Sequence, residues 1–234
     1  MAIGLGGFAV AINFIAMACA FTALWIPLWV SNTGTYLATD RNIQVGIWNL
    51  CVVQTRPDIK KHCFAYYTSQ GQLDDYNSPH SPLRADSMTS VCSNYASDDK
   101  RTVDALTNES GVHPESMHAF LAKTCSSSGH ATFALAICTV ICLFLSCAAL
   151  VVGIYLCRTM LVVVHVARFL TILAGLFSTV LSFVAFTHIS ELRYGPDGKF
   201  DLSVYLEGIS FVATIVLSWA IEQYLVHSGK HRTD

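Results

Sequence analysis

Charge is scarce in this sequence. Only 13% of its 234 residues are Asp, Glu, Lys or Arg, about half the share of a typical soluble domain. The 14 basic and 16 acidic residues nearly cancel, and a net charge of −2 argues against nucleic acid as a partner. No Lys or Arg precedes the first apolar run, whereas a cleavable signal peptide normally begins with a basic segment. We therefore expect a membrane protein that keeps its first apolar stretch.

Four apolar stretches are long enough to cross the hydrocarbon core of a bilayer, which takes roughly 20 helical residues. We predict transmembrane segments at 3–27, 131–154, 169–189 and 205–226. These four segments leave room for one helix bundle and one sizeable outer loop. We therefore treat residues 1–234 as a single membrane domain, with the lipid bilayer as its first partner.

Basic residues indicate the orientation of the chain. The connection 155–168 and the tail 227–234 contain Arg158, Arg168, Lys230 and Arg232, with almost no acidic residues nearby. Positive charge in short loops favours the cytoplasmic side of a membrane. Both termini are therefore predicted to be cytoplasmic, with 30–130 and 190–204 as the two outer loops.

Four of the nine cysteines fall in the first outer loop, namely Cys51, Cys63, Cys92 and Cys125. An even number of cysteines in an oxidising compartment predicts disulfides. Cys51 and Cys63 end one predicted strand and begin the next, so we expect them to bond. Cys92 and Cys125 then pair by elimination, although four cysteines allow three connectivities. Asn108 begins an Asn-Glu-Ser sequon, which could carry a glycan only outside the cell.

The first outer loop divides into two parts. Residues 31–68 contain short runs of alternating apolar residues, which predict strands. Residues 69–118 are rich in Ser, Asp, Asn and Pro and have little periodicity, which is typical of disorder, but Cys92 among them favours a segment that is tied down. The sequence leaves open whether this insert is ordered. A short helix is predicted at 115–123. In the second outer loop, a turn at 194–198 leads into a possible fifth strand at 199–205.

The remaining cysteines do not favour redox chemistry. Membrane thiol oxidoreductases use a Cys-x-x-Cys pair, but Cys138 and Cys142 have three residues between them. We therefore expect these two and Cys147 to pack in the bundle core. Cys157, at the cytoplasmic end of the second segment, is a candidate for palmitoylation.

Histidine suggests two further alternatives, which we favour less. A four-helix di-haem cytochrome needs two histidine pairs on different helices, and the ends of the predicted segments supply His130 with His188 and His165 with His227. Zinc could bind His80, His113 and His118, but their spacing is unspecific. At the ends of the segments, imidazoles carry no special cost. We predict no metal and no cofactor.

Two acidic residues, Glu207 and Glu222, lie in the last predicted segment near its ends. Intramembrane carboxylates are costly, so we expect placement at the membrane interface or pairing with another group. No pattern in the sequence arranges a nucleophile, a base and an oxyanion site. The protein is therefore predicted not to be an enzyme, with no small-molecule substrate.

Several short motifs resemble the claudin family: Pro27-Leu28-Trp29, then Gly46-Ile47-Trp48-Asn49-Leu50-Cys51, then Cys63. The wider superfamily includes the peripheral myelin proteins, the epithelial membrane proteins and the calcium-channel gamma subunits. The resemblance implies an all-α membrane protein, a left-handed bundle of four transmembrane helices with a small extracellular antiparallel β-sheet. We expect Trp29 and Trp48 at the membrane interface. Gly46 is expected where a side chain would block the packing of its strand.

A claudin-like protein would reside in the plasma membrane, with cell–cell junctions as a candidate location, and contact like molecules in cis or in trans. It would contribute to adhesion or to a paracellular barrier. Lys60 and Lys61, just before the second cysteine, would then influence charge selectivity. The insert at 69–118 and the tail 232–234, which lacks a hydrophobic end, favour an alternative: an auxiliary, gamma-type subunit of a larger ion channel or receptor.

Overall fold

The computed structural model describes residues 2–33, 41–54, 60–68, 90–156, 161–189 and 198–230. The chain divides into two compact units. A helical bundle comprises Met1–Thr22, Ala134–Ser182 and Tyr205–Asp234, and an outer unit comprises Ala23–Phe133 and Phe183–Val204. Each unit is described separately below.

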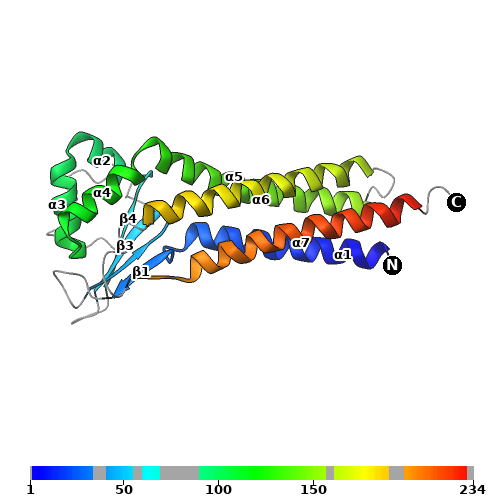
Figure 1. Cartoon of the computed structure of the whole chain (residues 1–234), viewed down its shortest axis with the longest axis horizontal. Coiled ribbons are helices and arrows are strands. Elements are labelled where there is room, and N and C mark those ends of the chain that lie inside the picture. The colour runs from blue at the N-terminus through cyan, green and yellow to red at the C-terminus, as the bar shows by residue number, and fades with distance from the viewer. Residues whose placement is uncertain are drawn as a thin grey trace. The chain divides into compact units, whose positions relative to one another are not determined.

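Four long helices form the bundle (Figure 1): α1 Ala2–Trp25, α5 Ser127–Val151, α6 Leu161–Ile189 and α7 Leu202–Lys230. Within the described residues, these are the helices long and apolar enough to cross a membrane. Their apolar side chains face outward as well as inward, as expected for helices whose outer surface meets lipid. The structure thus agrees with a multi-pass membrane protein.

The third long helix begins earlier than predicted. Helix α6 starts at Leu161 rather than at 169, and α5 continues into a π-helical turn at Val152–Leu156. The predicted 155–168 connection is therefore helical over most of its length, and only 157–160, including Cys157 and Arg158, lies outside the described residues. The prediction assigned Arg168 to the connection because it is charged. In the structure this residue lies inside α6, where it pairs with Glu222.

Small residues and a few polar side chains fill the bundle interior. Ala16, Ala20 and Ala174 are buried around Leu143, and such small residues let helices approach closely in a membrane. Asn13 and Ser146 are fully buried, with the amide of Asn13 2.9 Å from Ser146 Oγ. Every polar group inside lipid needs such a partner.

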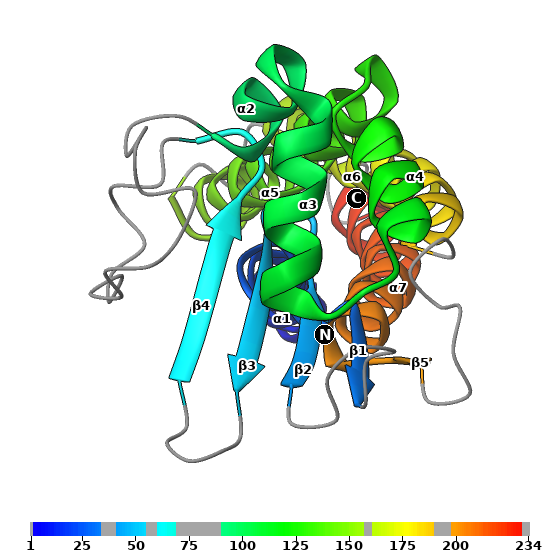
Figure 2. The same ribbon diagram turned by 90° about the vertical axis from the view of Figure 1, so that its left-hand side faces the viewer.

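The outer unit contains a five-stranded antiparallel sheet: β1 Val30–Thr33, β2 Arg41–Val45, β3 Asn49–Gln54, β4 Lys60–Ala65 and β5 Gly198–Phe200. The strand order is β4-β3-β2-β1-β5, and Figure 2 shows β4 to β1 side by side. The predicted fifth strand is shorter than expected, because Leu202 already begins α7. The predicted turn before it lies outside the described residues.

Two helices lie within the predicted insert and a third begins there: α2 Val91–Ser97, α3 Asp99–Ser110 and α4 Pro114–Thr124. The side chain of Asp98 caps α3 by accepting from the backbone N–H of Arg101, and Gly111 ends it at a φ of 72°. Residues 90–118 of the insert are therefore ordered, a point that the sequence leaves open, whereas 69–89 lies outside the described residues. The predicted helix at 115–123 corresponds to α4.

Candidate interaction surface

The helical cover, which we define as α2, α3 and α4, packs on one face of the sheet (Figure 2). Strand residues alternate between faces, and the covered face contributes Ile43, Val45, Leu50, Val52 and Phe64 to a common core. Opposite them, the cover contributes Val91, Val103, Leu106, Met117, Phe120 and Leu121. The cover is thus an integral part of the outer unit.

The other face of the sheet, which we call the polar face, includes Ser31, Asn42, Gln44 and Lys61. Lys61 is exposed and the other three are half-buried. Cys51 and Cys63 stand on this face as partners in the β3–β4 register. Their sulfur atoms are at bonding distance, 1.99 Å, so a disulfide joins the two strands. The side chain of Lys60 lies outside the described residues.

A second disulfide joins Cys92 to Cys125, with Cα atoms 5.1 Å apart. It connects the start of α2 to the residue that ends α4. The backbone N–H of Cys92 also donates to the carbonyl of Tyr66, at 3.1 Å. Both ends of the helical cover are therefore tied down beside the sheet.

The residues behind the family resemblance lie together near the sheet. A Cβ atom on Gly46 would stand 2.8 Å from Pro27 Cα, so this position has no room for a side chain. Trp48 is half-buried and its ring lies 5.0 Å from that of Phe133. Ile47 is buried at 7% exposure.

Trp29 differs from its expected place at the membrane interface. It is only 3% exposed, and its indole N–H donates to the carbonyl of Ala23 at 2.8 Å. That carbonyl belongs to the last turn of α1, where backbone acceptors lack helical partners. The indole therefore serves as a buried cap rather than as a lipid-facing anchor.

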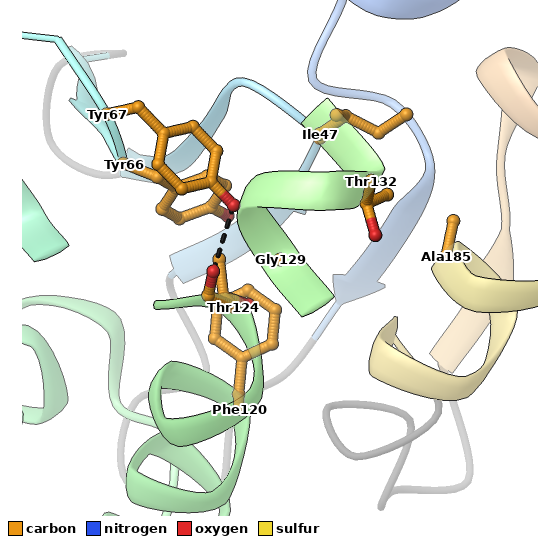
Figure 3. Close-up of a pocket in the computed structure, with 9 residues that line it drawn as sticks. Ile47, Tyr66, Tyr67, Phe120, Thr124, Gly129, Thr132 and Ala185 are labelled. Atoms are coloured by element: carbon orange, nitrogen blue, oxygen red, sulfur yellow. Dashed lines mark hydrogen bonds between the residues drawn. The ribbon is translucent and has the colours of Figure 1, made fainter. Parts of the chain in front are cut away.

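A cavity of about 30 Å³ lies beside the sheet within the outer unit (Figure 3). Its lining includes Tyr66, Tyr67, Phe120, Thr132 and Ala185. Tyr67 donates its hydroxyl to the carbonyl of Thr124 at 2.9 Å. The hydroxyl of Tyr66 is buried without a hydrogen-bond partner among the described residues. Burial raises the pKa of both tyrosines above the usual range, and for Tyr66 the neighbouring Tyr67 adds to the effect.

The other predicted site residues are separate from this surface. Asn108 is exposed on α3, in keeping with its accessibility to a glycan. His118 lies 3.8 Å from Asp99 across the cover, His113 precedes α4 and His80 lies outside the described residues. His130 is the exception, because its ring contacts that of Tyr67 beside the cavity, with ring centroids 4.7 Å apart and the planes tilted by 45°.

The remaining histidines and thiols lie along the bundle helices. His165 and His227 are exposed, and the side chain of His188 lies outside the described residues. Cys138 is exposed, whereas Cys142 and Cys147 are half-buried. The prediction that these three thiols pack in the bundle core therefore holds only in part.

Two pairings of the last helix involve residues that sequence reasoning did not identify. Glu207 is 2% exposed and accepts a hydrogen bond from Ser178 of α6, so the expected pairing is found. Glu222 accepts from Arg168 at 3.1 Å. The acidic residues were visible in the sequence, but their partners come from another helix and are set by the packing.

Compared with models of known protein families and with curated protein sequences, the chain matches none. The resemblance to claudins therefore rests on the short motifs around Trp29, Trp48 and the first two cysteines.

Proposed function

We propose that this chain is a claudin-like, non-enzymatic protein of the plasma membrane, with both termini in the cytoplasm. Its disulfide-bonded outer unit contacts like molecules in cis or in trans at cell–cell junctions. The consequence is adhesion or a paracellular barrier. Four bilayer-length helices and a cysteine-stapled sheet support this proposal, together with the motif resemblance.

One observation carries the proposal: the sheet ends in an edge strand beside a polar face. Strand β4 is last in the order and has a strand neighbour on one side only among the described residues. Free strand edges are natural pairing surfaces for a second chain. The exposed Lys61 lies on this strand and gives the surface positive charge.

A mixed-cell assay tests the proposal. Tagged protein is expressed in non-adhesive cells, and enrichment at contacts is expected only where both neighbours express it. Lys61→Glu should lower this enrichment and shift any paracellular permeability toward cations. Lys100→Glu is the matched control, because it makes the same charge change at an exposed position on the cover. Uniform surface distribution of the unaltered protein would contradict the proposal.

The second candidate function is an auxiliary subunit of a larger ion channel or receptor in the same membrane. The helical cover favours it, because it packs on one face of β2, β3 and β4 and leaves less of the sheet for contact between like molecules. Crosslinking in cells that express the full chain, followed by mass spectrometry, should then recover a larger membrane protein. Recovery of this chain alone would count against the subunit function.

A further inference from the structure

A groove of about 520 Å³ runs along the outer surface of the bundle between α6 and α7. Helix α6 lines it from Thr171 to Thr179, and α7 lines it from Phe211 to Glu222. With a rise of 1.5 Å per residue, the α7 side is about 16 Å long. This length suits an extended acyl chain.

Apart from Ser218 and Glu222 toward one end, the groove makes little polar demand. Each of its three threonines donates its hydroxyl to a carbonyl of its own helix: Thr171 to Ala167, Thr179 to Gly175 and Thr214 to Phe211. Ile172, Leu176, Ile215 and Trp219 form exposed apolar walls, with about half of each side chain accessible. An apolar chain therefore fits the groove better than a polar helix that needs hydrogen-bond partners.

One end of the groove is charged. Glu222 lines this end, and Arg168 donates from Nη2 to Glu222 Oε2 at 3.1 Å. Side-chain exposures of 33% for Arg168 and 53% for Glu222 leave both groups accessible. The Nε of Arg168 is buried and has no acceptor among the described residues. A group outside the bundle therefore reaches the guanidinium through the third of this side chain that is exposed, and not through Nε.

By its place along the helices, the charged end lies just inside the edge of the hydrocarbon core, within side-chain reach of lipid headgroups. The apolar part of α6 spans Leu161–Thr187, about 40 Å long, whereas the hydrocarbon core is about 30 Å thick. Arg168 is seven residues into this helix, so its Cα is roughly 5 Å inside the core. Its long side chain can extend to the interface. In the predicted orientation, this is the cytoplasmic leaflet.

We propose that the α6–α7 groove binds a phospholipid with a phosphoethanolamine headgroup. The phosphate accepts hydrogen bonds from Arg168, the ammonium group donates to Glu222, and one acyl chain follows the groove past Trp219. The neutral Arg–Glu pair complements a headgroup that is neutral but carries both charges. A purely anionic headgroup would be repelled by the carboxylate of Glu222, and a choline headgroup has no N–H to donate to it. This inference does not depend on the proposed function.

Trp219 supplies the test, because bromine atoms on a neighbouring acyl chain quench tryptophan fluorescence. The full chain is placed in lipid nanodiscs that contain dibrominated phosphatidylethanolamine or phosphatidylcholine with the same chains. Subtracting the signal of Trp219→Phe isolates Trp219 from the other three tryptophans. We expect half-maximal quenching at about threefold less of the ethanolamine lipid, the scale of a partly exposed ion pair. Equal quenching by both lipids would overturn the proposal.

Two variants localise the effect. Glu222→Gln should abolish the preference for ethanolamine. Thr179→Phe, which fills the groove, should reduce quenching to the choline level, whereas Val180→Phe, at an exposed position outside the lining, should not. Quenching unchanged by Thr179→Phe would show that the lipid does not enter the groove. A series of brominated lipids whose ethanolamine headgroup carries one, two or three N-methyl groups tests the unaltered protein. The quenching of Trp219 should fall along this series as N–H donors are lost.

Discussion

Tyr66 and Tyr67 are neighbours in the chain, but their hydroxyl groups have different surroundings. The hydroxyl of Tyr67 has a backbone acceptor at 2.9 Å, whereas that of Tyr66 has no partner among the described residues. A buried polar group without a partner costs about 1–3 kcal/mol, and a typical hydrogen bond contributes about 1 kcal/mol. The two residues therefore form a natural pair for comparison.

Removing each hydroxyl should have opposite effects on stability. Tyr67→Phe is expected to lower the free energy of unfolding by about 1 kcal/mol, because it removes a hydrogen bond. Tyr66→Phe should leave that free energy unchanged or raise it by up to about 1 kcal/mol. Denaturant unfolding of the outer unit in the detergent-solubilised full chain measures both. A loss in Tyr66→Phe equal to that in Tyr67→Phe would indicate a partner, such as a water in the cavity.

Alkaline pH should destabilise the outer unit through the same residues. An unperturbed tyrosine ionises near pH 10, but burial raises the pKa of Tyr66 and Tyr67 in the folded protein. Above about pH 10, the unfolded chain therefore releases protons that the folded chain retains, so stability is full below this pH and falls as the pH rises. Phenolate absorbance should lag in the folded protein relative to the unfolded one. Coincident titration curves would contradict this expectation.

Trp29 illustrates a limit of prediction at this scale. An indole suits a membrane interface and a buried cap equally well, because both have an apolar surrounding and an acceptor for the N–H. The choice depends on whether the carbonyl of Ala23 is within reach, which only the chain path after α1 decides.

At the scale of elements, substitutions in the helical cover test how the outer unit is held together. Leu106 on α3 is 1% exposed and belongs to the core shared with the sheet. Leu106→Ala should lower the free energy of unfolding by about 2–5 kcal/mol, because it leaves a cavity. Asp104→Ala, on the exposed side of the same helix, should change it by no more than about 0.5 kcal/mol. Equal effects would show that α3 does not pack on the sheet.

The four long helices were predictable because the thickness of a bilayer fixes their length and composition. The strands around Cys51 and Cys63 were predictable from alternating apolar residues. Helix α3 was not, because its buried positions include Thr102, Thr107 and Ser110, which read as polar in a sequence. The start of α6 was missed for a similar reason, since the pairing of Arg168 is a tertiary contact.

At the scale of the whole molecule, one modification tests the predicted orientation in the membrane. Asn108 is exposed on the outer unit, so in the predicted orientation it should carry a glycan. A glycosidase should increase the mobility of the unaltered protein on a gel, and Asn108→Gln should remove the effect. An epitope tag on the tail should be detectable only after the cells are permeabilised. A tag accessible on intact cells would reverse the orientation.

The Cys92–Cys125 bond also bears on how such a sequence can change over evolutionary time. Because its two Cα atoms are 5.1 Å apart, the 32 residues between them leave and rejoin the rest of the chain at nearly one place. Two residues of extended backbone would span that gap. Segments with closely spaced ends tolerate changes in length well. Among relatives, insertions and deletions between these cysteines should therefore fall in the connections between the helices of the cover, because the helices themselves pack on the sheet. The order and register of the five strands should stay the same.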